Sequence, residues 1–268
     1  MAGISGNSNI GSTSRLNQAQ ENIRRTLERL ATGRRINQAS DDAAGLQISN
    51  NLRADIRVLN QGQRNASTAF GITQIADQTL GDAGSLLERA GEIAIQAASG
   101  TTSAAGRDAL NAELQEIFGQ LDSLGQNTNF DGEAIFGGSF SARTGESDTE
   151  QVDVNVDNLS TADLGLAGAN LSTATDASNA LDQIQSAISQ LSSSRGEIGA
   201  TQQRLTTTIE AIQARVISTQ EAESQIADAD VAEEVVNLTK FRILAESGVS
   251  AIAQGNQLNA QTITSLLA

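Results

Sequence analysis

The fold of this chain is decided by residues 181–226, LDQIQSAISQLSSSRGEIGATQQRLTTTIEAIQARVISTQEAESQI. Residues at alternating spacings of three and four form an unbroken heptad seam, which places one largely apolar stripe along a helix. At 1.5 Å per residue such a helix is about 70 Å long, so it needs other long helices beside it. The seam consists of Leu181, Ile184, Ile188, Leu191, Arg195, Ile198, Gln202, Leu205, Ile209, Ile212, Val216, Thr219, Glu223 and Ile226.

Four positions of this seam are polar, namely Arg195, Gln202, Thr219 and Glu223. One interpretation is that they fix the register of the helices or reach solvent at the edge of the stripe. The other is a buried polar site. No other feature of the sequence supports such a site, so the first interpretation is favoured.

The composition excludes several classes of protein. The chain has 268 residues with no Pro, Cys, His, Trp or Tyr and only 6 Phe. Without His and Cys the usual zinc, haem and iron–sulfur sites have no ligands, and Ser/His or Cys/His triads cannot form. Neither a GxxxxGK[ST] loop nor a GxGxxG motif is present. We therefore predict no catalytic residues, no metal and no cofactor.

The charge is strongly acidic and unevenly spread. The formal net charge is −15, which opposes nonspecific binding to nucleic acid. Residues 1–40 carry 6 Arg and 2 Glu, so 6 − 2 = +4, whereas residues 221–234 carry six carboxylates and no base, so −6. We expect the basic arm to lie near this acidic turn, through Arg24, Arg25, Arg34 and Arg35.

The sequence shows neither a membrane-spanning segment nor a classical signal peptide. No stretch is apolar and long enough to span a membrane. Residues 1–8 lack the charged start and apolar core of a classical signal peptide, which favours the cytoplasm unless a dedicated export route exists.

The order of patterns along the chain predicts helices around a small insert. We expect residues 1–12 to be flexible and helices at about 14–32, 43–98, 104–124 and 231–267, with a loop at 223–230. Asp176 is expected to cap the long helix. Alternating Val152, Val154 and Val156 predict a strand, so residues 129–172 form a β-containing insert, whose polar side chains such as Thr144 are expected at the surface.

Both terminal helices carry apolar stripes with no third layer to cover them, which suggests assembly with other subunits. The second helix has a stripe from Ile48 to Ala94, and its glycines at 62, 71, 81, 84 and 91 are expected to admit close neighbours rather than break it. The terminal stripes are Leu16, Ile23, Leu27 and Leu30 in the first helix, and Val231, Val235, Leu238, Phe241, Val249 and Ile252 in the last.

The two ends together resemble bacterial flagellin, over roughly residues 14–136 and 176–268. The combination is specific, whereas each piece alone is weak. The matching pieces are Glu28-Arg29-Leu30, Gly33, Arg35-Ile36-Asn37, Asp41-Asp42-Ala43-Ala44-Gly45, Ile93-Ala94-Ile95-Gln96-Ala97-Ala98, Asn129-Phe130-Asp131-Gly132, Ile226-Ala227-Asp228-Ala229-Asp230, Ala253-Gln254-Gly255-Asn256-Gln257 and Ser265-Leu266-Leu267.

This resemblance implies a structural subunit of the flagellar filament, exported unfolded and polymerised outside the cell. It implies a mostly α fold, an elongated bundle of long coiled-coil-like helices with a small β-hairpin at 139–157. Residues 1–40 and 223–268 would form an inner-tube coiled coil, and residues 41–222 an outer-tube rod. The implied partners are further copies of the chain, an export chaperone, and cap and junction proteins. Neither nucleic acid nor a membrane is implied.

Some flagellins are ligands of Toll-like receptor 5, and the matching positions here are Arg89, Ile93 and Glu113. The family pattern has Gln where Glu88 stands and Leu where Ile93 stands, so the resemblance implies weak recognition. Without the resemblance, Arg89 and Glu113 would be assigned to a solvated helix face.

Three alternatives to a filament subunit remain. A hook–filament junction protein shares terminal helices of this type. A cytoplasmic coiled-coil scaffold would explain the heptads but not the terminal motifs. An enzyme hosted in the insert, as in some flagellins that carry a metalloprotease, is disfavoured because the chain has no His.

Overall fold

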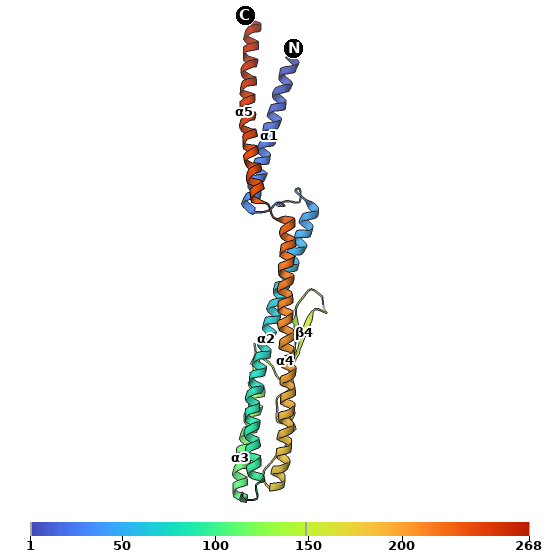
Figure 1. The fold of residues 1–268 in the computed structure, drawn as a ribbon, viewed down its shortest axis with the longest axis vertical. Helices are drawn as coiled ribbons and strands as arrows, with labels where there is room; N and C mark the ends of the chain where they lie inside the picture. The colour runs from blue at the N-terminus through green and yellow to red at the C-terminus, as the bar shows by residue number, and fades with distance from the viewer. Residues whose placement is uncertain (1, 148, 268) are drawn as a thin grey trace. The chain divides into compact units, whose positions relative to one another are not determined.

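A computed structural model describes residues 2–147 and 149–267. Over these ranges it contains five helices and four short strands (Figure 1). In chain order they are α1 (Ala2–Thr32), α2 (Ala43–Ala98), α3 (Ala104–Asn127), β1 (Asn129–Phe130), β2 (Glu133–Ala134), β3 (Ser139–Arg143), β4 (Gln151–Asn155), α4 (Ala174–Ala227) and α5 (Val231–Leu267). The mostly α fold with a β-hairpin is confirmed.

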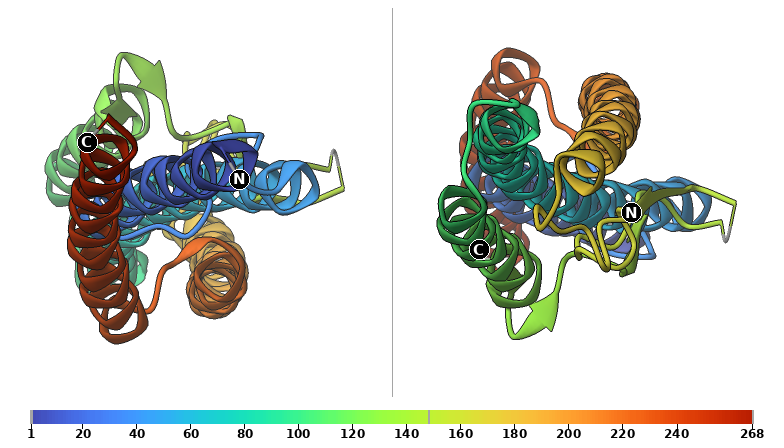
Figure 2. Two further views of the ribbon diagram at one scale, coloured as in Figure 1. Left: turned by 90° about the horizontal axis from the view of Figure 1, so that it is seen from above. Right: turned by 90° about the horizontal axis from the view of Figure 1, so that it is seen from below.

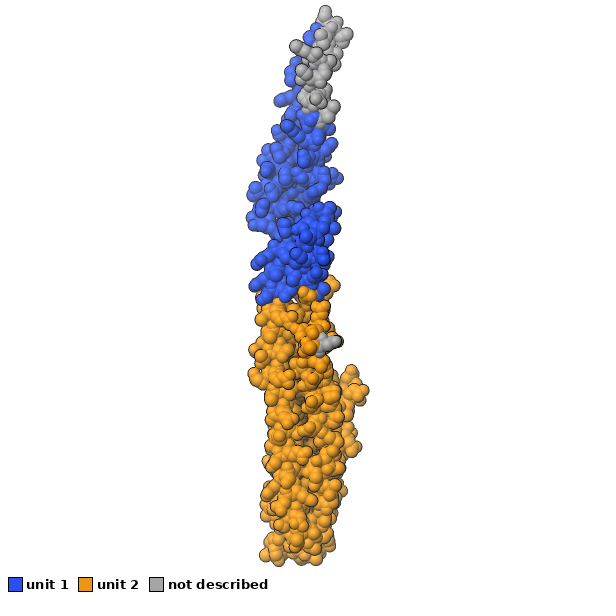
Figure 3. Space-filling view, turned by 90° about the vertical axis from the view of Figure 1, so that its right-hand side faces the viewer, with its two compact units in different colours: residues 1–54, 218–268 blue, residues 55–217 orange. Residues whose placement is uncertain are grey.

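The chain forms two compact units, coloured separately in Figure 3. Unit 1 consists of residues 1–54 and 218–268, and unit 2 of residues 55–217. Both boundaries between the units fall inside helices, α2 and α4. The boundaries expected from the resemblance were 40/41 and 222/223.

The helices are longer than the sequence patterns predicted at three points. Helix α1 begins at Ala2 rather than near residue 14, so the predicted start of this helix was too late. Helix α3 extends to Asn127, and α4 extends to Ala227, which shortens the expected loop at 223–230 to residues 228–230. Gly, Ser and Asn lower helix propensity, but without proline none of them stops a helix that packs against another.

The start of α4 is fixed by a reciprocal pair of hydrogen bonds. The backbone N–H of Asp176 donates to the Thr173 hydroxyl at 3.0 Å, and the N–H of Thr173 donates to the Asp176 carboxylate at 3.2 Å. This is a capping box, in which Thr173 is the N-cap residue and Asp176 the third helical residue. The predicted N-cap, Asp176, therefore lies three residues after the actual N-cap, Thr173.

The heptad seam of α4 is confirmed. Its apolar members are buried or half-buried, and Ile184 and Leu205 are 0% exposed. Among the polar members, Arg195 has an exposed side chain: it is 48% exposed, and its Nε lies 3.0 Å from the Asp77 carboxylate. A polar residue at this position therefore reaches solvent at the edge of the stripe, as the favoured interpretation held.

The core of unit 2 lies between α2, α3 and α4. Figure 2 shows these helices nearly end-on, with the chain from 128 to 173 running over them. Small residues of α2 such as Ala66, Ala76 and Ala90 are 0% exposed, so the helices approach closely with few large side chains. The expected stripe of α3, Leu110, Leu114, Ile117, Leu121 and Leu124, is buried or half-buried, whereas Ile48 of the expected α2 stripe is 49% exposed.

The predicted hairpin is present. Strands β3 and β4 pair antiparallel, with Ser139 opposite Asn155 and Arg143 opposite Gln151. Val152 and Val154 point into the core, as does Val156 just beyond the strand. A smaller pair, β1 with β2, turns at Asp131 and Gly132, whose φ angles of 53° and 85° are left-handed.

The hairpin is anchored to two helices. The carbonyl of Thr144 lies against Gly62 of α2, where an added Cβ would be 2.2 Å from that oxygen. Arg215 of α4 donates to the Glu150 carboxylate at 3.0 Å, which lowers the pKa of Glu150 below its usual range. The Thr144 side chain is 6% exposed and its hydroxyl donates to the Glu150 carbonyl at 2.9 Å, so the prediction that Thr144 lies at the surface is wrong.

The expectation that glycines of α2 admit close neighbours holds at some positions only. An added Cβ at Gly84 would lie 3.5 Å from Leu191, and one at Gly91 would lie 3.8 Å from Ile184, both in α4. At Gly71 nothing lies within 4 Å.

Residues 156–172, which we name the strap, follow α3 without forming a strand. Polar side chains of α3 hold its main chain at several points. The Asp122 carboxylate accepts from the N–H of Thr161 at 2.7 Å, and Asn111 accepts from the N–H of Leu171 at 2.9 Å. Leucines of the strap, including Leu166 and Leu171, complete the core. These side-chain bonds replace a backbone ladder.

Candidate functional site

Helices α1 and α5 lie side by side and antiparallel in unit 1 (Figure 1). Arg29 near the end of α1 contacts Glu234 near the start of α5, and Gly248 further along α5 faces Leu16. The buried and half-buried positions recur at spacings of three and four on both helices. The positions with this spacing are Ser12, Leu16, Ala19, Ile23, Thr26 and Leu30 on α1, and Glu234, Leu238, Phe241, Ala245, Gly248, Ile252 and Gly255 on α5, and the neighbouring Asn22, Arg29 and Asn237 are half-buried as well.

The ten predicted stripe residues therefore divide into two groups. Leu16, Ile23, Leu30, Leu238, Phe241 and Ile252 are half-buried on the faces just listed. The other four remain exposed in the single chain: Leu27 at 43%, Val231 at 56%, Val235 at 48% and Val249 at 54%.

Helix α5 exposes further apolar side chains that the predicted stripe did not include. Val236 is 66% exposed, Ile243 60% and Leu244 51%. The signal was present in the adjacent pairs Val235-Val236 and Ile243-Leu244, because neighbouring residues point about 100° apart and cannot share one narrow stripe. Helix α5 thus carries more apolar surface than one partner helix covers.

The connections that follow α1 and α4 are pinned to each other. The N–H of Ala229 donates to the carbonyl of Gly33 at 3.0 Å, and the N–H of Arg35 donates to the carbonyl of Ala227 at 2.7 Å. Arg34 and Asp228 form an isolated antiparallel bridge. Gly33 has φ +70°, which only glycine adopts without strain.

Charged side chains reinforce this crossing within unit 1. Glu223 of α4 accepts a hydrogen bond from the Ser49 hydroxyl at 2.9 Å, and Arg53 Nε lies 3.2 Å and Arg34 3.8 Å from the same carboxylate oxygen. The Glu223 side chain is only 14% exposed. The polar seam position at 223 thus joins α4 to α2 and to the connection after α1, which agrees with a role in register.

The predicted pairing of the basic arm with the acidic turn is confirmed in part, within one chain. Arg34 lies beside Glu223, but Arg35 donates to the carbonyl of Ile226 and Arg25 pairs with Glu21 of its own helix. Arg24 is exposed. The shorter of the two ion pairs between the arm and the turn, Arg29 with Glu234 at 3.1 Å, involves an arginine outside the predicted four.

Asp41 organises the loop before α2. Its carboxylate accepts the N–H groups of Gln38 at 3.0 Å and Asn37 at 3.1 Å. The Gln38 hydrogen bond, with that of Asn37 and the nearby Arg29 and Arg25, lowers the pKa of Asp41 below its usual range despite partial burial.

The three predicted receptor contacts differ in how far their side chains are exposed to solvent. Arg89 of α2 donates to Glu113 of α3 at 2.8 Å and to Glu92 at 2.9 Å, and hydrogen bonding to Glu113 raises the pKa of Arg89. The side chains of Arg89 and Glu113 are 55% and 45% exposed. Ile93 is 1% exposed and belongs to the core, so its side chain is not on the surface.

Metal sites and membrane spans concern the parts of the chain that the structure describes. There, no group of three or more His, Cys, Asp or Glu side chains has an arrangement that could hold a metal ion. Among the same residues, no helix contains a segment apolar and long enough to cross a lipid bilayer.

These features define a class of protein: a helical structural protein in which α1 and α5 pair and present uncovered apolar surface for assembly. Residues 6–141 match the family described as the bacterial flagellin N-terminal helical region, and residues 181–267 match the bacterial flagellin C-terminal helical region. The chain belongs to the bacterial flagellin family.

Individual relatives support the same family assignment. The flagellar filament 33 kDa core protein of Treponema phagedenis is 31% identical over 264 residues, covering 91% of this chain and 92% of the relative. A flagellin of Bacillus subtilis is 30% identical over 291 aligned positions, covering 94% of this chain and 96% of the relative.

Solved structures support the fold. A putative flagellar hook-associated protein from Vibrio parahaemolyticus superposes with a TM-score of 0.60 at 14% identity, covering 70% of this chain and 100% of that one. Bacillus cereus flagellin superposes with a TM-score of 0.50 at 23% identity, covering 56% of this chain and 88% of that one. At such identities the likeness concerns the fold alone.

The chain is a structural subunit of the extracellular flagellar filament and not an enzyme. The flagellin matches at both ends do not favour the hook–filament junction alternative. Self-assembly into a homopolymer follows from the family.

Proposed function

We propose that the α1–α5 pair forms the inner tube of the filament and that unit 2 forms the outer tube. The observation that carries this proposal is the apolar surface that α5 leaves exposed, at Val231, Val235, Val236, Ile243, Leu244 and Val249. A helix pair with apolar residues on its outer faces is stable in water only when further copies cover those faces. Neighbouring α1–α5 pairs would supply that cover.

The predicted terminal stripes have two roles in this proposal. The half-buried residues on the facing sides of α1 and α5, such as Leu16 and Phe241, hold the pair together in one subunit. The exposed residues, Leu27 of α1 with Val231, Val235 and Val249 of α5, contact the next subunit. Val236, Ile243 and Leu244 join this second group.

Seeded polymerisation tests the proposal. Purified chain is added to sonicated filament fragments, and elongation is followed by light scattering and electron microscopy. The variant Ile243→Ser with Leu244→Ser should lose elongation while unit 2 keeps its melting temperature. The matched control Thr239→Ser, on an exposed position of the same helix, should elongate as wild type does. Normal elongation of the double variant would show that this surface is not an assembly surface.

We also propose that an export chaperone covers the exposed apolar face of α5 before assembly, and that cap and junction proteins contact the same terminal helices. The support is again the uncovered surface of α5, which is an aggregation hazard in a free chain. Co-purification of a chaperone with wild type but not with the Ile243→Ser, Leu244→Ser variant is the expected result.

A weak contact with Toll-like receptor 5 is proposed through Arg89 and Glu113, which form an exposed pair across α2 and α3. The buried Ile93 would act only by holding α2 in place. In a reporter-cell assay on monomer, signalling should be weak and should fall further in Arg89→Ala, whereas Arg204→Ala should leave it unchanged. Full potency that survives Arg89→Ala would exclude this contact.

A further inference from the structure

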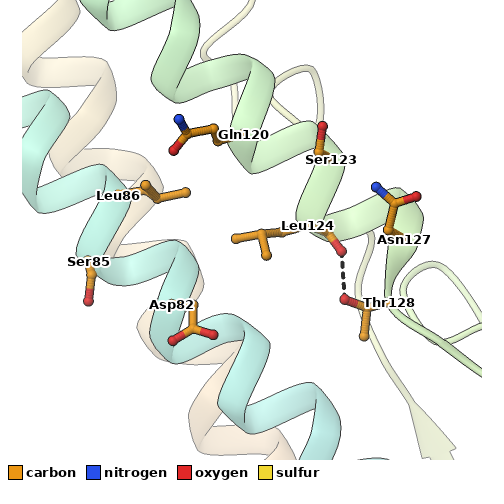
Figure 4. A pocket seen from close by; sticks show the side chains of 8 residues that line it. All are labelled: Asp82, Ser85, Leu86, Gln120, Ser123, Leu124, Asn127 and Thr128. Atoms are coloured by element: carbon orange, nitrogen blue, oxygen red, sulfur yellow. Dashed lines mark hydrogen bonds between the residues drawn. The ribbon is translucent and has the colours of Figure 1, made fainter.

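Unit 2 contains an open groove between α2 and α3. It has a volume of about 530 Å³ and is lined by Asp82, Ser85, Leu86, Gln120, Ser123, Leu124, Asn127 and Thr128. Figure 4 shows Leu86 of α2 and Leu124 of α3 pointing toward each other across it, with Asp82 and Gln120 at its edges. The groove therefore offers an apolar floor with a carboxylate and amide groups at its rim.

The stretch of sequence that contains both walls of this groove is acidic, although Arg195 of α4 lies beside Gly81 and pairs with Asp77. Residues 77–138 hold 2 Arg against 10 Asp and Glu, so 2 − 10 = −8. One of those arginines, Arg89, is already paired with Glu92 and Glu113. No cationic side chain lines the groove itself. A positively charged occupant is therefore favoured over a neutral or negative one.

A matching surface lies elsewhere on α2. Arg57, Gln61 and Arg64 stand at spacings of four and three on one face of the helix, and all three are exposed. We name this face the α2 edge. Arg64 donates to Gln61 at 2.5 Å, while Arg57 has no ion pair or side-chain hydrogen bond to any residue within 2–147 and 149–267. Residues 55–76 carry 2 Arg and 1 Asp, so +1, in a unit that is otherwise acidic.

We propose that the α2–α3 groove binds the α2 edge of a second copy of the chain. An arginine side chain fits the groove because its aliphatic stem can cover Leu86 and Leu124 while the guanidinium reaches the Asp82 carboxylate and the amide oxygen of Gln120. This contact rests on the assembly function of the chain and adds a specific interface in unit 2 to it.

The geometry of such a contact suits a filament. The groove and the α2 edge are different patches of the same chain, so the contact is heterologous. Each bound copy presents a free groove or a free edge, and the contact can repeat without closing. Because rim charges act mainly on the association rate, the contact should orient incoming subunits, and burial of apolar surface elsewhere should supply most of the free energy.

Cysteine cross-linking tests the proposal directly, because the chain has no cysteine of its own. Ser85→Cys places a thiol in the groove and Gln61→Cys places one in the α2 edge, and neither removes a charge. The double variant is elongated from wild-type seeds without added wild-type chain, so that neighbouring subunits carry both thiols, and is then treated with a short bis-maleimide. Cross-linked species larger than the monomer are expected on a denaturing gel, and they should be absent for either single variant.

The matched control replaces Gln61→Cys by Gln74→Cys, an exposed position of α2 about 140° around the helix and about 20 Å along it from Gln61. This control pair should give no ladder. Elongation with no ladder from the Ser85, Gln61 pair, or an equal ladder from the control, overturns the proposed contact and leaves filament assembly intact. Failure of wild-type chain to elongate from the same seeds would instead count against the assembly function itself.

Charge exchange gives an independent measurement. Arg57→Glu with Arg64→Glu should slow elongation at low salt by about tenfold, and the difference should shrink at 1 M salt. Adding Asp82→Arg to the same chain should restore part of the rate. A further loss on adding Asp82→Arg would show that the two surfaces are not partners.

Discussion

Gly62 of α2 and Thr144 of the hairpin meet backbone to backbone. A Cβ built on Gly62 would lie 2.2 Å from the Thr144 carbonyl oxygen and 2.6 Å from its carbonyl carbon, so no other residue fits at position 62 without moving the hairpin. The neighbouring Asn65 donates to the carbonyl of Arg143 at 2.9 Å and fixes the hairpin at the same place.

The first prediction compares two glycines of the same helix. Gly62→Ala should destabilise unit 2 by about 1–3 kcal/mol, because the methyl group displaces a backbone segment. Gly71→Ala should stabilise it by about 0.5–1 kcal/mol, because nothing lies within 4 Å and alanine favours the helix. Thermal unfolding followed by circular dichroism measures both. A shift for Gly62→Ala that is no more destabilising than the shift for Gly71→Ala would contradict the packing described at Gly62.

The second prediction concerns the seam of α4. Leu205→Ala should destabilise the chain by about 2–5 kcal/mol, because Leu205 is 0% exposed. Thr144→Ala should cost about 0.5–1.5 kcal/mol through the lost hydrogen bond to Glu150. Ser141→Ala on the exposed side of β3 should stay within about 0.5 kcal/mol. Chemical denaturation gives all three, and equal values would mean that the buried face is wrongly assigned.

The third prediction is a pH dependence at the hairpin. Arg215 lowers the pKa of Glu150 in the folded chain below the usual value of 4.5, so this pairing stabilises the fold above that pH. The contribution is lost as the pH falls through the folded pKa. Glu150→Gln should therefore melt slightly below wild type at pH 7, and the difference should shrink as the pH falls below 4.5. A difference that does not change with pH would come from packing instead.

The fourth prediction concerns the α1–α5 pair. Arg29→Glu should weaken it by about 1–3 kcal/mol, because Glu234 is only 8% exposed and would lose its partner. Adding Glu234→Arg should restore only part of this, since a cation near the start of α5 opposes the helix dipole. Helix content against temperature measures the effect. Arg24→Glu, at an exposed position of α1, is the control and should change little.

The fifth prediction concerns the free subunit. Limited proteolysis of monomer should remove both ends and leave a fragment close to unit 2, because α1 and α5 each have one neighbouring helix and exposed apolar residues. Filaments should resist the same protease. Equal resistance of monomer and filament would show that the α1–α5 pair is stable without assembly.

The spacing of apolar residues predicted which side of a helix is buried where apolar residues alone occupy that side. It failed where a polar residue takes a place on the buried side. The seam through Ile184 and Leu205 was readable because apolar spacing alone decides which side of α4 is buried. The exposure of Leu27 could not be predicted in this way, because Thr26 occupies the buried side of α1 in its place. A buried threonine among polar residues gives no apolar signal.

The functional surfaces were predicted to a similar extent. Charge counting placed the basic arm near the acidic turn and thus anticipated the contact of Arg34 with Glu223. It could not select Arg29 as the partner of Glu234, because net charge carries no geometry. The α2–α3 groove was not predictable, since its leucines belong to two helices whose relative rotation is set by the whole core.

The strap has a consequence for the order in which unit 2 folds. The side chains of α3 that hold it are separated from their partners by 39 residues for Asp122 with Thr161, 54 for Gln115 with Ala169, 60 for Asn111 with Leu171 and 65 for Arg107 with Ser172. The first contact closes the shortest loop, and each one that forms leaves only a short segment to be closed by the next. Once the 39-residue loop between Asp122 and Thr161 has closed, the strap can pair along α3 toward Arg107 in three further short steps. The start of α4 would then reach α3 after one closure of 39 residues and three local ones, rather than in a single search over 65 residues.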